Sequence, residues 1–186
     1  MRTALKEWAV VIEALAAKRQ IFLLRKGGIA EGRRGFELQR SEFLLYPTWE
    51  HQQEPLVSPR WRELFQRLAP ATEDEVTFRY WAKVEEICHA PTDRERLKRA
   101  ADRHVWADEY VDQRYDYRPD LPLFLVLVQI QQLASPVSIP FDRRYRGCRS
   151  WVDLADEIPL EGSRPIWDEA EYEEERNALL AALKHG

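Results

Sequence analysis

The sequence has few of the features that mark common metal-binding modules and small enzymes. Its two cysteines, Cys88 and Cys148, lie far apart without a CxxC pair or a zinc-finger spacing. Neither a disulfide framework nor a structural zinc site is therefore expected. No GxxxxGK(S/T) phosphate loop occurs, and the absence of any E-x-K triplet argues against a self-sufficient nuclease of the restriction type. We expect no metal and no cofactor.

Long hydrophobic runs are absent as well. The longest purely apolar run, LFLVLV at 123–128, is far shorter than the roughly 20 residues that a membrane-spanning helix needs. The first ten residues, MRTALKEWAV, carry charges where a signal peptide would keep an apolar stretch. We therefore predict a cytoplasmic protein without membrane contact.

Acidic side chains are concentrated near the C-terminus. Residues 153–186 hold 3 basic against 10 acidic side chains, whereas residues 1–152 hold 25 basic against 22 acidic. The basic side chains of the main body are mostly arginine, which suits recognition of phosphates or base edges, although an ordinary solvated surface is the alternative. We predict one α+β domain over residues 1–154 and an acidic extension with a helix over residues 155–186.

The N-terminal half predicts a helix followed by short buried strands. Leu5, Trp8, Ile12 and Leu15 recur at helical spacing, so a helix is expected from about residue 3 to residue 17, with Thr3 as its N-cap. QIFLLR and FLLY read as buried strands. Pro47 must end the hydrogen bonding of the second strand or place that strand on a sheet edge.

The clearest strand in the chain is EVTFRYWAKVEEIC at 75–88. Its alternation places Phe78 and Tyr80 on one face and Arg79 and Trp81 on the other. LFLVLVQI predicts another buried strand, and the prolines around the VSI triplet at 137–139 indicate a turn or edge segment.

Helices are expected at 93–103, after a capping box formed by Thr92 and Glu95, at about 107–115, and beyond Pro165. These helices do not alternate regularly with the strands. The expected fold is therefore α+β, with a curved, mostly antiparallel sheet or a small barrel surrounded by helices, and not a doubly wound parallel sheet.

Several stretches resemble known families. LKEWAVVIEALAAKRQIFLLRKGGI, FLLYPTWEHQ and SIP…YRGCRSWVDL resemble a bacterial family of unknown function, DUF1802, over roughly residues 3–154. The order of a helix, a strand that ends in arginine and later long strands also resembles the ASCH domains of the PUA-like pseudo-barrel superfamily. This resemblance implies a PUA-like, ASCH-like fold that binds RNA or DNA, frequently with a modified or flipped base in an aromatic pocket.

Some ASCH proteins are amidohydrolases that act on acetylated cytidine through a lysine, a threonine and a glutamate. Lys18 stands in the place of that lysine, but Ile21 replaces the expected threonine, which argues against the same activity. A hydrolase of another design would use Lys18 or His51 with a carboxylate, Glu50 or Glu85, for proton transfer.

Two segments supply the residues of a predicted ligand pocket. In one, basic residues at a strand end are followed by two glycines whose backbone can approach a ligand. In the other, an apolar strand runs directly into aromatic and hydrogen-bonding side chains suited to stacking on a base and reading its edge. The predicted ligand-binding residues are Arg25, Lys26, Gly27, Gly28, Tyr46, Thr48, Trp49, Glu50 and His51. The alternatives are a solvated hairpin tip and an aromatic core at the strand end.

A third segment, at 143–151, interleaves arginines with aromatic residues. Its arginines are predicted to contact a nucleic-acid backbone while its aromatic side chains stack on bases. The residues concerned are Arg143, Arg144, Arg146, Arg149, Tyr145 and Trp151. Alternatively, the arginines pair with the acidic C-terminal helix, which would then compete with nucleic acid, and Trp151 seals the core.

The sequence thus predicts a domain that binds nucleic acid, RNA or DNA, with recognition of a modified base as the finer hypothesis. A hydrolase of small molecules or modified nucleosides that uses the same pocket is the second hypothesis. A protein-interaction module that binds a partner through the C-terminal helix is the third.

Overall fold

The computed structural model describes residues 1–26, 40–50, 52–68, 74–147 and 150–184. The strands are β1 (Thr3–Trp8), β2 (Phe22–Lys26), β3 (Glu42–Thr48), β4 (Glu75–His89), β5 (Leu123–Pro140), β6 (Trp151–Asp153) and β7 (Arg164–Pro165). The α-helices are α1 (Ala9–Ala16), α2 (Arg62–Arg67), α3 (Arg94–Arg99), α4 (Asp108–Asp116) and α5 (Glu169–Lys184). Short 3-10 turns are η1 (Glu54–Leu56), η2 (Pro59–Trp61), η3 (Ala101–Arg103) and η4 (Arg143–Tyr145). None of the described helices is long and apolar enough to span a membrane.

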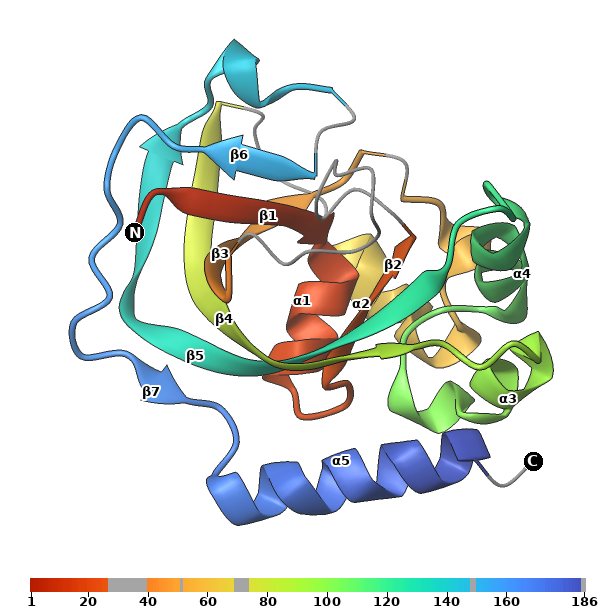
Figure 1. Cartoon of the computed structure of the whole chain (residues 1–186). Coiled ribbons are helices and arrows are strands. Elements are labelled where there is room, and N and C mark those ends of the chain that lie inside the picture. The colour runs from red at the N-terminus through yellow and green to blue at the C-terminus, as the bar shows by residue number, and fades with distance from the viewer. Residues whose placement is uncertain (27–39, 51, 69–73, 148–149, 185–186) are drawn as a thin grey trace.

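The strands form one mixed sheet in the order β2-β5-β4-β3-β1-β6, and β7 adds to β5 outside this order. The β1–β3 pair is parallel, and the other described pairs are antiparallel. Figure 1 shows the sheet curling around α1, which lies inside the arc of β1, β3, β4 and β5. The predicted α+β fold with a curved, mostly antiparallel sheet is confirmed.

The first strand corrects the predicted N-terminal helix, which begins at Ala9 and not at Thr3. Residues 3–8 lie between β3 and β6 and pair with both, so sheet pairing overrides the helical spacing of their apolar side chains. Pro47 lies in β3 opposite Glu7 of β1, beyond the stretch of β3 that pairs with β4. The proline therefore occupies the part of β3 that has a single neighbour, as its missing N–H requires.

The β4–β5 ladder is the longest in the protein, and it is interrupted twice. Phe78 pairs with Val137 and Tyr80 pairs with Gln132, so four residues of β5, 133–136, stand opposite Arg79 alone. Such an irregularity bends the sheet and tolerates Pro136 because the ladder is already broken there. Of the two alternatives predicted for the VSI triplet, the turn is wrong and the edge segment is confirmed: residues 137–139 continue β5 and, among the described strands, pair with the start of β4 alone.

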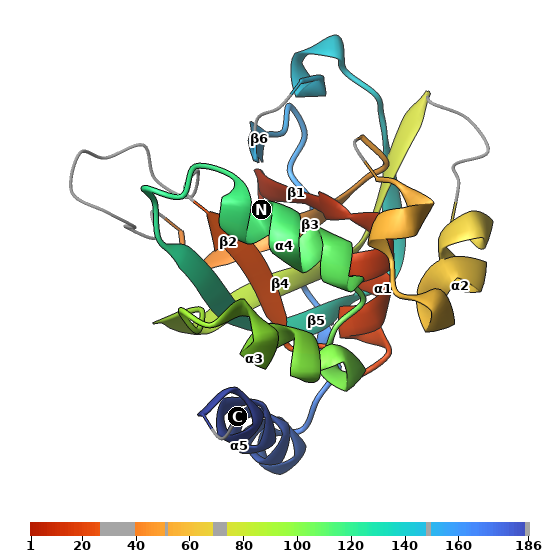
Figure 2. The ribbon, with the colours of Figure 1, turned by 90° about the vertical axis from the view of Figure 1, so that its right-hand side faces the viewer.

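Helices α3 and α4 lie over β2 and β5, and α5 runs beside α3 (Figure 2). Asp93 caps α3 by accepting a hydrogen bond from the Glu95 amide, so the cap lies one residue later than the predicted Thr92. The helix ends at Arg99 and continues only as the η3 turn, because the Ala100 backbone leaves the helical conformation.

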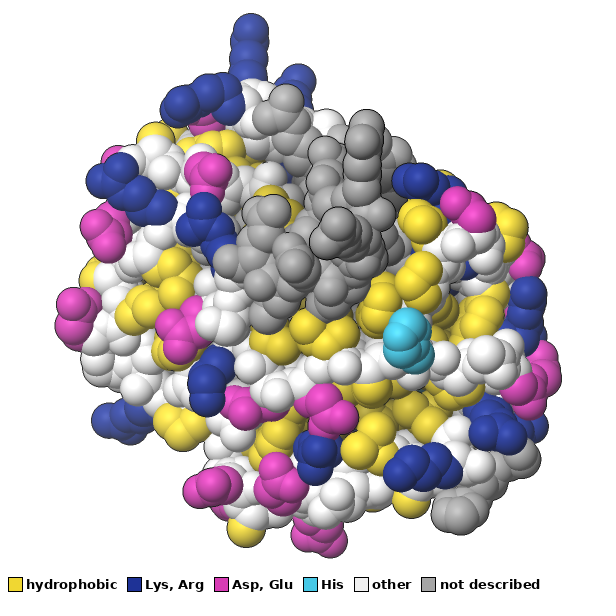
Figure 3. All heavy atoms as spheres, in the orientation of Figure 1, with side chains coloured by type: hydrophobic (Ala, Val, Ile, Leu, Met, Phe, Trp, Pro, Cys, Tyr) yellow, Lys and Arg dark blue, Asp and Glu magenta, His cyan; other side chains and the backbone are white. Residues whose placement is uncertain are grey.

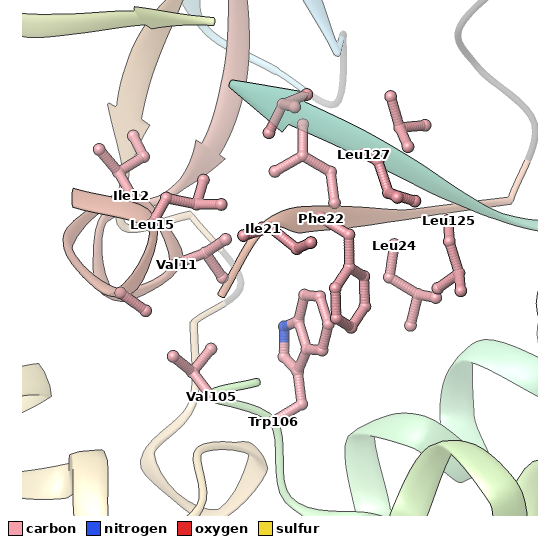
Figure 4. Close-up of a cluster of buried hydrophobic side chains, with 14 of the residues drawn as sticks. Val11, Ile12, Leu15, Ile21, Phe22, Leu24, Val105, Trp106, Leu125 and Leu127 are labelled. Atoms are coloured by element: carbon pink, nitrogen blue, oxygen red, sulfur yellow. The ribbon is translucent and has the colours of Figure 1, made fainter. Parts of the chain in front are cut away.

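The main core lies where α1, β2 and β5 meet the segment before α4. Figure 4 shows Phe22 packed against Trp106, with Ile21, Leu125 and Leu127 around them. The Phe22 and Trp106 rings meet edge to face with their centroids 5.6 Å apart. A second cluster, which includes Tyr46, Phe78 and Tyr145, fills the other side of the curled sheet.

The C-terminal helix packs on this main core through Tyr172, Leu179 and Leu183, all of which are buried. Its polar side chains form ion pairs with the rest of the chain, as in the pairs Lys18–Glu171 and Arg103–Glu175. These three apolar side chains of the helix that was predicted to bind a partner protein are therefore covered within this chain. The division of the chain at residue 154 stays a prediction.

His104 should make the stability of the fold sensitive to acid. Its ring is fully buried between Phe22 and Trp106, with Nε2 3.0 Å from the Leu97 carbonyl oxygen, and burial lowers its pKa. The unfolded chain, whose histidine titrates near 6.5, then binds the proton more tightly than the folded protein does. We expect the free energy of unfolding to fall as pH drops below about 6.5, by at most about 1.4 kcal/mol per pH unit from this group.

Urea unfolding of the wild type and of His104→Gln at pH 7.5, 6.5 and 5.5 tests this expectation. The variant should lose part of the pH dependence, whereas His89→Gln, a change at an exposed histidine, should retain it. If the free energy of unfolding depended on pH equally in the wild type and in His104→Gln, His104 would not be the group responsible.

Candidate functional site

Three segments that lie far apart in the sequence converge on Lys6 and Glu7 of β1. Arg25, at the far edge strand β2, donates to the Lys6 carbonyl oxygen at 3.1 Å and to Glu7 Oε2 at 2.6 Å. Because β1 and β2 stand near opposite ends of the strand order, this contact joins the two ends of the curled sheet. Glu7 is 8% exposed and Arg25 is 15% exposed, so the ion pair lies largely out of water.

Lys6, on the other face of β1, joins the second and third segments. Its Nζ donates to Glu50 Oε2 at 3.2 Å and to the Gly147 carbonyl oxygen at 3.0 Å. The same ammonium lies 5.7 Å from the centre of the Tyr46 ring. We call Lys6, Glu7, Arg25, Tyr46 and Glu50 the β1 cluster.

Tyr46 is nearly completely buried and packs edge to face on Phe78 and Tyr145. Burial, with smaller effects from Glu50 and Tyr145, raises the pKa of Tyr46 to about 12. The tyrosine is therefore a neutral part of the second core cluster, and its ring face is covered by protein and not by solvent.

The remaining residues of the two predicted pocket segments have other partners. Lys26 donates to the Tyr115 carbonyl oxygen at 2.5 Å, and burial lowers its pKa. Thr48 accepts a hydrogen bond from the Glu50 amide at 3.1 Å. Gly27, Gly28 and His51, together with Arg149 of the third segment, lie outside the described residues.

The third predicted segment divides into exposed arginines and packed aromatic residues. Arg143, Arg144 and Arg146 are exposed, and Arg144 forms an ion pair with Asp142 at 2.6 Å. Tyr145 is buried and accepts a hydrogen bond from the Ala155 amide at 3.0 Å, and Trp151 packs edge to face on Phe43. The aromatic side chains thus serve the interior here, while the arginines face solvent.

The acidic helix does not lie over these arginines. Figure 3 shows Lys and Arg side chains projecting from the upper end of the molecule, which carries η4 in Figure 1. Acidic side chains gather at the lower edge, over α5. The hypothesis that the helix competes with nucleic acid for the arginines is therefore wrong in this structure.

The described residues considered for a hydrolase form ion pairs with three different partners. Lys18 forms an ion pair with Glu171 of α5, Glu50 pairs with Lys6, and Glu85 pairs with Lys83 at 3.0 Å. Within the part of the chain that the structure describes, no three His, Cys, Asp or Glu side chains lie together as a metal site would require.

A pocket of about 420 Å³ lies between α1, α2, β3 and β4. We call it the α1–β4 pocket. Its apolar floor comes from Ala9, Ile12, Leu45, Pro47, Leu68 and Val76. Its polar and aromatic lining comes from Glu13, Trp49, Arg67, Glu75, Thr77, Arg79 and Tyr80. Among the described residues predicted to bind a ligand, Trp49 is the one that lines this pocket.

The Trp49 indole is fixed at the pocket wall. Its Nε1 donates to the Leu68 carbonyl oxygen at 2.6 Å, which ties the segment after β3 to the end of α2. The side chain nevertheless remains 37% exposed, one of two large hydrophobic residues with so much open surface among the described residues. An aromatic ring that is fixed by a hydrogen bond and still partly exposed is suited to stacking on a flat ligand.

Glu13 is the acidic residue of a helix whose other side chains are almost all buried and apolar. Burial raises the pKa of Glu13, and the nearby Arg79 opposes that effect. Burial likewise raises the pKa of Tyr80, which Glu13 raises further. The charges of Arg79 and Glu13 therefore act on other groups that line the α1–β4 pocket.

Arg79 and Tyr80 are consecutive residues, and regular strand alternation would send them to opposite faces. Both line the pocket, as do the consecutive residues Glu75, Val76 and Thr77, and the break in the β4–β5 ladder between Phe78 and Tyr80 redirects the side chains next to it. Sequence reasoning missed Arg79 and Tyr80 for this reason, and it missed Glu13 because the helix that carries it was considered for its apolar spacing alone. The signal that was present is a single carboxylate in AVVIEALA, which no core helix needs.

The fold and the pocket define an α+β protein with a curled sheet and a ligand-sized cavity beside a break in its longest ladder. The chain belongs to the family described as "Domain of unknown function (DUF1802)", whose model matches residues 4–178. This match continues past residue 154 into α5. No curated protein matches the chain.

Solved structures of an ASCH protein from Zymomonas mobilis resemble this chain. One is 13% identical with a TM-score of 0.41, and covers 97% of this chain and 94% of its own. A mutant form of the same protein is 10% identical with a TM-score of 0.43, and covers 95% of this chain and 96% of its own. The predicted membership in DUF1802 is thus confirmed by the family match.

Removal of the Arg25 side chain should destabilise the fold strongly. Arg25→Met leaves the Glu7 carboxylate buried without its cation, and breaking a buried pair in this way costs about 3–5 kcal/mol. Urea unfolding measures the decrease in stability. Arg67→Met is the matched control, because Arg67 and its partner Glu63 are both mostly exposed, and its cost should stay within about 1 kcal/mol.

Combining Arg25→Met with Glu7→Gln should cost less than the sum of the two single changes, since the double variant leaves no buried charge unpaired. Equal costs for Arg25→Met and Arg67→Met would show that the pair does not hold the ends of the sheet together.

Proposed function

We propose that the protein binds single-stranded nucleic acid and holds one base in the α1–β4 pocket. The observation that carries this proposal is a cavity of about 420 Å³ lined by the partly exposed Trp49 and by two ionisable side chains, Glu13 and Arg79. Neither of these two side chains forms a hydrogen bond or an ion pair with another described residue. Ligand pockets for small molecules and cofactors commonly have volumes of about 300–1,000 Å³. A base with part of its sugar fits within that range.

The aromatic lining supports base stacking. Trp49 and Tyr80 come from separate elements and both border the cavity. Base–aromatic stacking contributes about 1–3 kcal/mol per base and does not depend on sequence. A base can reach such a wall only when it is unpaired, which favours a single strand over a duplex.

Cationic side chains line the pocket and follow the end of β5 beside it, and they could contact the phosphates of a bound strand. Arg67 and Arg79 belong to the pocket lining itself. The exposed arginines of η4 follow directly on the end of β5, where Pro140 pairs with Glu75 and the Phe141 amide donates to the Asp74 carbonyl oxygen at 2.7 Å. Glu75 also lines the pocket, so the η4 arginines and the pocket share one end of the β4–β5 ladder.

Trp49→Ala should weaken binding of a fluorescein-labelled octanucleotide, measured by anisotropy at low salt, by about 5- to 150-fold, as removal of one stacking wall predicts. Tyr117→Ala is the matched control, because Tyr117 is the other exposed large hydrophobic residue and lies on the chain after α4. Its affinity should equal that of the wild type.

Replacing Arg143 and Arg144 together by glutamine should lower the slope of log affinity against log salt by about 1 for each arginine that neutralises a phosphate. The slope, measured between about 50 and 200 mM salt, is independent of base stacking. An octanucleotide that does not bind the wild type at the lower salt concentration would overturn the proposed function.

A further inference from the structure

Two opposite charges share the α1–β4 pocket without pairing. Glu13 and Arg79 both line it, and the positive charge of Arg79 opposes the effect of burial on the pKa of Glu13. Among the residues that the structure describes, however, neither side chain forms a hydrogen bond or an ion pair with another. Glu13 is partly buried and Arg79 is exposed, so water or a ligand must supply the hydrogen bonds that the protein does not.

These two groups make opposite demands on a ligand. An ionised carboxylate only accepts hydrogen bonds, through two oxygens, whereas a guanidinium only donates them, in a planar fork. A ligand that satisfies both must present two adjacent donors on one side and acceptors on the other. It must also be flat, because Trp49 and Tyr80 border the same cavity.

Guanine is the common base with this pattern. Its ring N1–H and exocyclic amine are adjacent donors, and its O6 and N7 are the acceptors that arginine contacts in a bidentate manner. Adenine and cytosine place a ring acceptor beside their amine, so one carboxylate oxygen would face a lone pair. Uracil and thymine place a carbonyl oxygen on each side of their single N–H, with the same consequence.

We infer that the α1–β4 pocket selects guanine, with Glu13 accepting from N1–H and the exocyclic amine and Arg79 donating to O6 and N7. This inference rests on the proposed function and adds base selectivity to it. Glu13 is the determinant that separates guanine from the other bases, because arginine alone also tolerates other acceptors.

The test compares octathymidylate with the same strand carrying one central deoxyguanosine, deoxyinosine or 7-deazadeoxyguanosine. Wild-type protein should bind the guanine strand about tenfold or more tightly than octathymidylate, which is the range of one good bidentate base contact. Deoxyinosine lacks the exocyclic amine and should lose most of this preference. The 7-deaza base lacks N7 and should lose part of it.

Matched variants assign each contact to its residue. Glu13→Gln keeps the side-chain shape but turns a donor toward the base, and it should bring guanine and inosine strands within about threefold of each other. Arg79→Gln should remove the difference between guanine and its 7-deaza analogue. Glu174→Gln, the same change at an exposed position of α5, should leave all preferences unchanged.

The outcomes separate the two proposals. Binding of every strand with equal affinity would overturn guanine selection and leave nucleic-acid binding standing. A guanine preference that survives Glu13→Gln would overturn the role of Glu13. Binding of no strand would overturn the proposed function itself. Should Glu13→Gln fail to fold, the guanine-to-inosine comparison on wild-type protein still decides whether the exocyclic amine is read.

Discussion

The break in the β4–β5 ladder is the constraint on which the shape of this protein depends. Two strands of 15 and 18 residues would form an evenly twisted ribbon without a sharp bend if they paired without interruption. Four residues of β5 stand opposite Arg79, and a second irregularity follows between Val84 and Glu86, so the ribbon bends twice. The bend brings β2 round to β1, where the Arg25–Glu7 pair closes the gap between the ends of the sheet.

The same break shapes part of the pocket. Regular pairing sends alternate side chains of a strand to opposite faces, and the break shifts this alternation, so that Phe78 lies in the second core cluster whereas Tyr80 packs against the main core. At Arg79 the alternation fails, and consecutive residues reach the space between α1 and α2. The break therefore contributes both to the curvature of the sheet and to the lining of the pocket, whose other walls come from α1, α2, β3 and the residue Trp49 just after β3.

Sequence periodicity predicted the elements whose signal is local. The strand at β4, the start of β5, and helices α4 and α5 follow from alternation, apolar runs and charge placement. The strand β1 could not be predicted in this way, because its conformation is imposed by pairing with β3 and β6 and its apolar spacing suits a helix. For the pocket, the sequence indicated Trp49 because polar residues surround it. No local pattern in the sequence predicted that Arg79 and Tyr80 both line the same pocket.

Glu13 is the residue whose position is hardest to explain by stability alone. Helix α1 lies inside the curled sheet, and six of its eight residues are buried and apolar. A carboxylate in such a helix loses hydration, which is the main cause of its raised pKa, and among the described residues it gains no hydrogen bond in return. A leucine or an alanine would pack there at lower cost, as they do elsewhere in the helix. Residues that break a local rule without compensation inside the fold are where function is expected to lie, and Glu13 breaks that rule at the wall of the α1–β4 pocket.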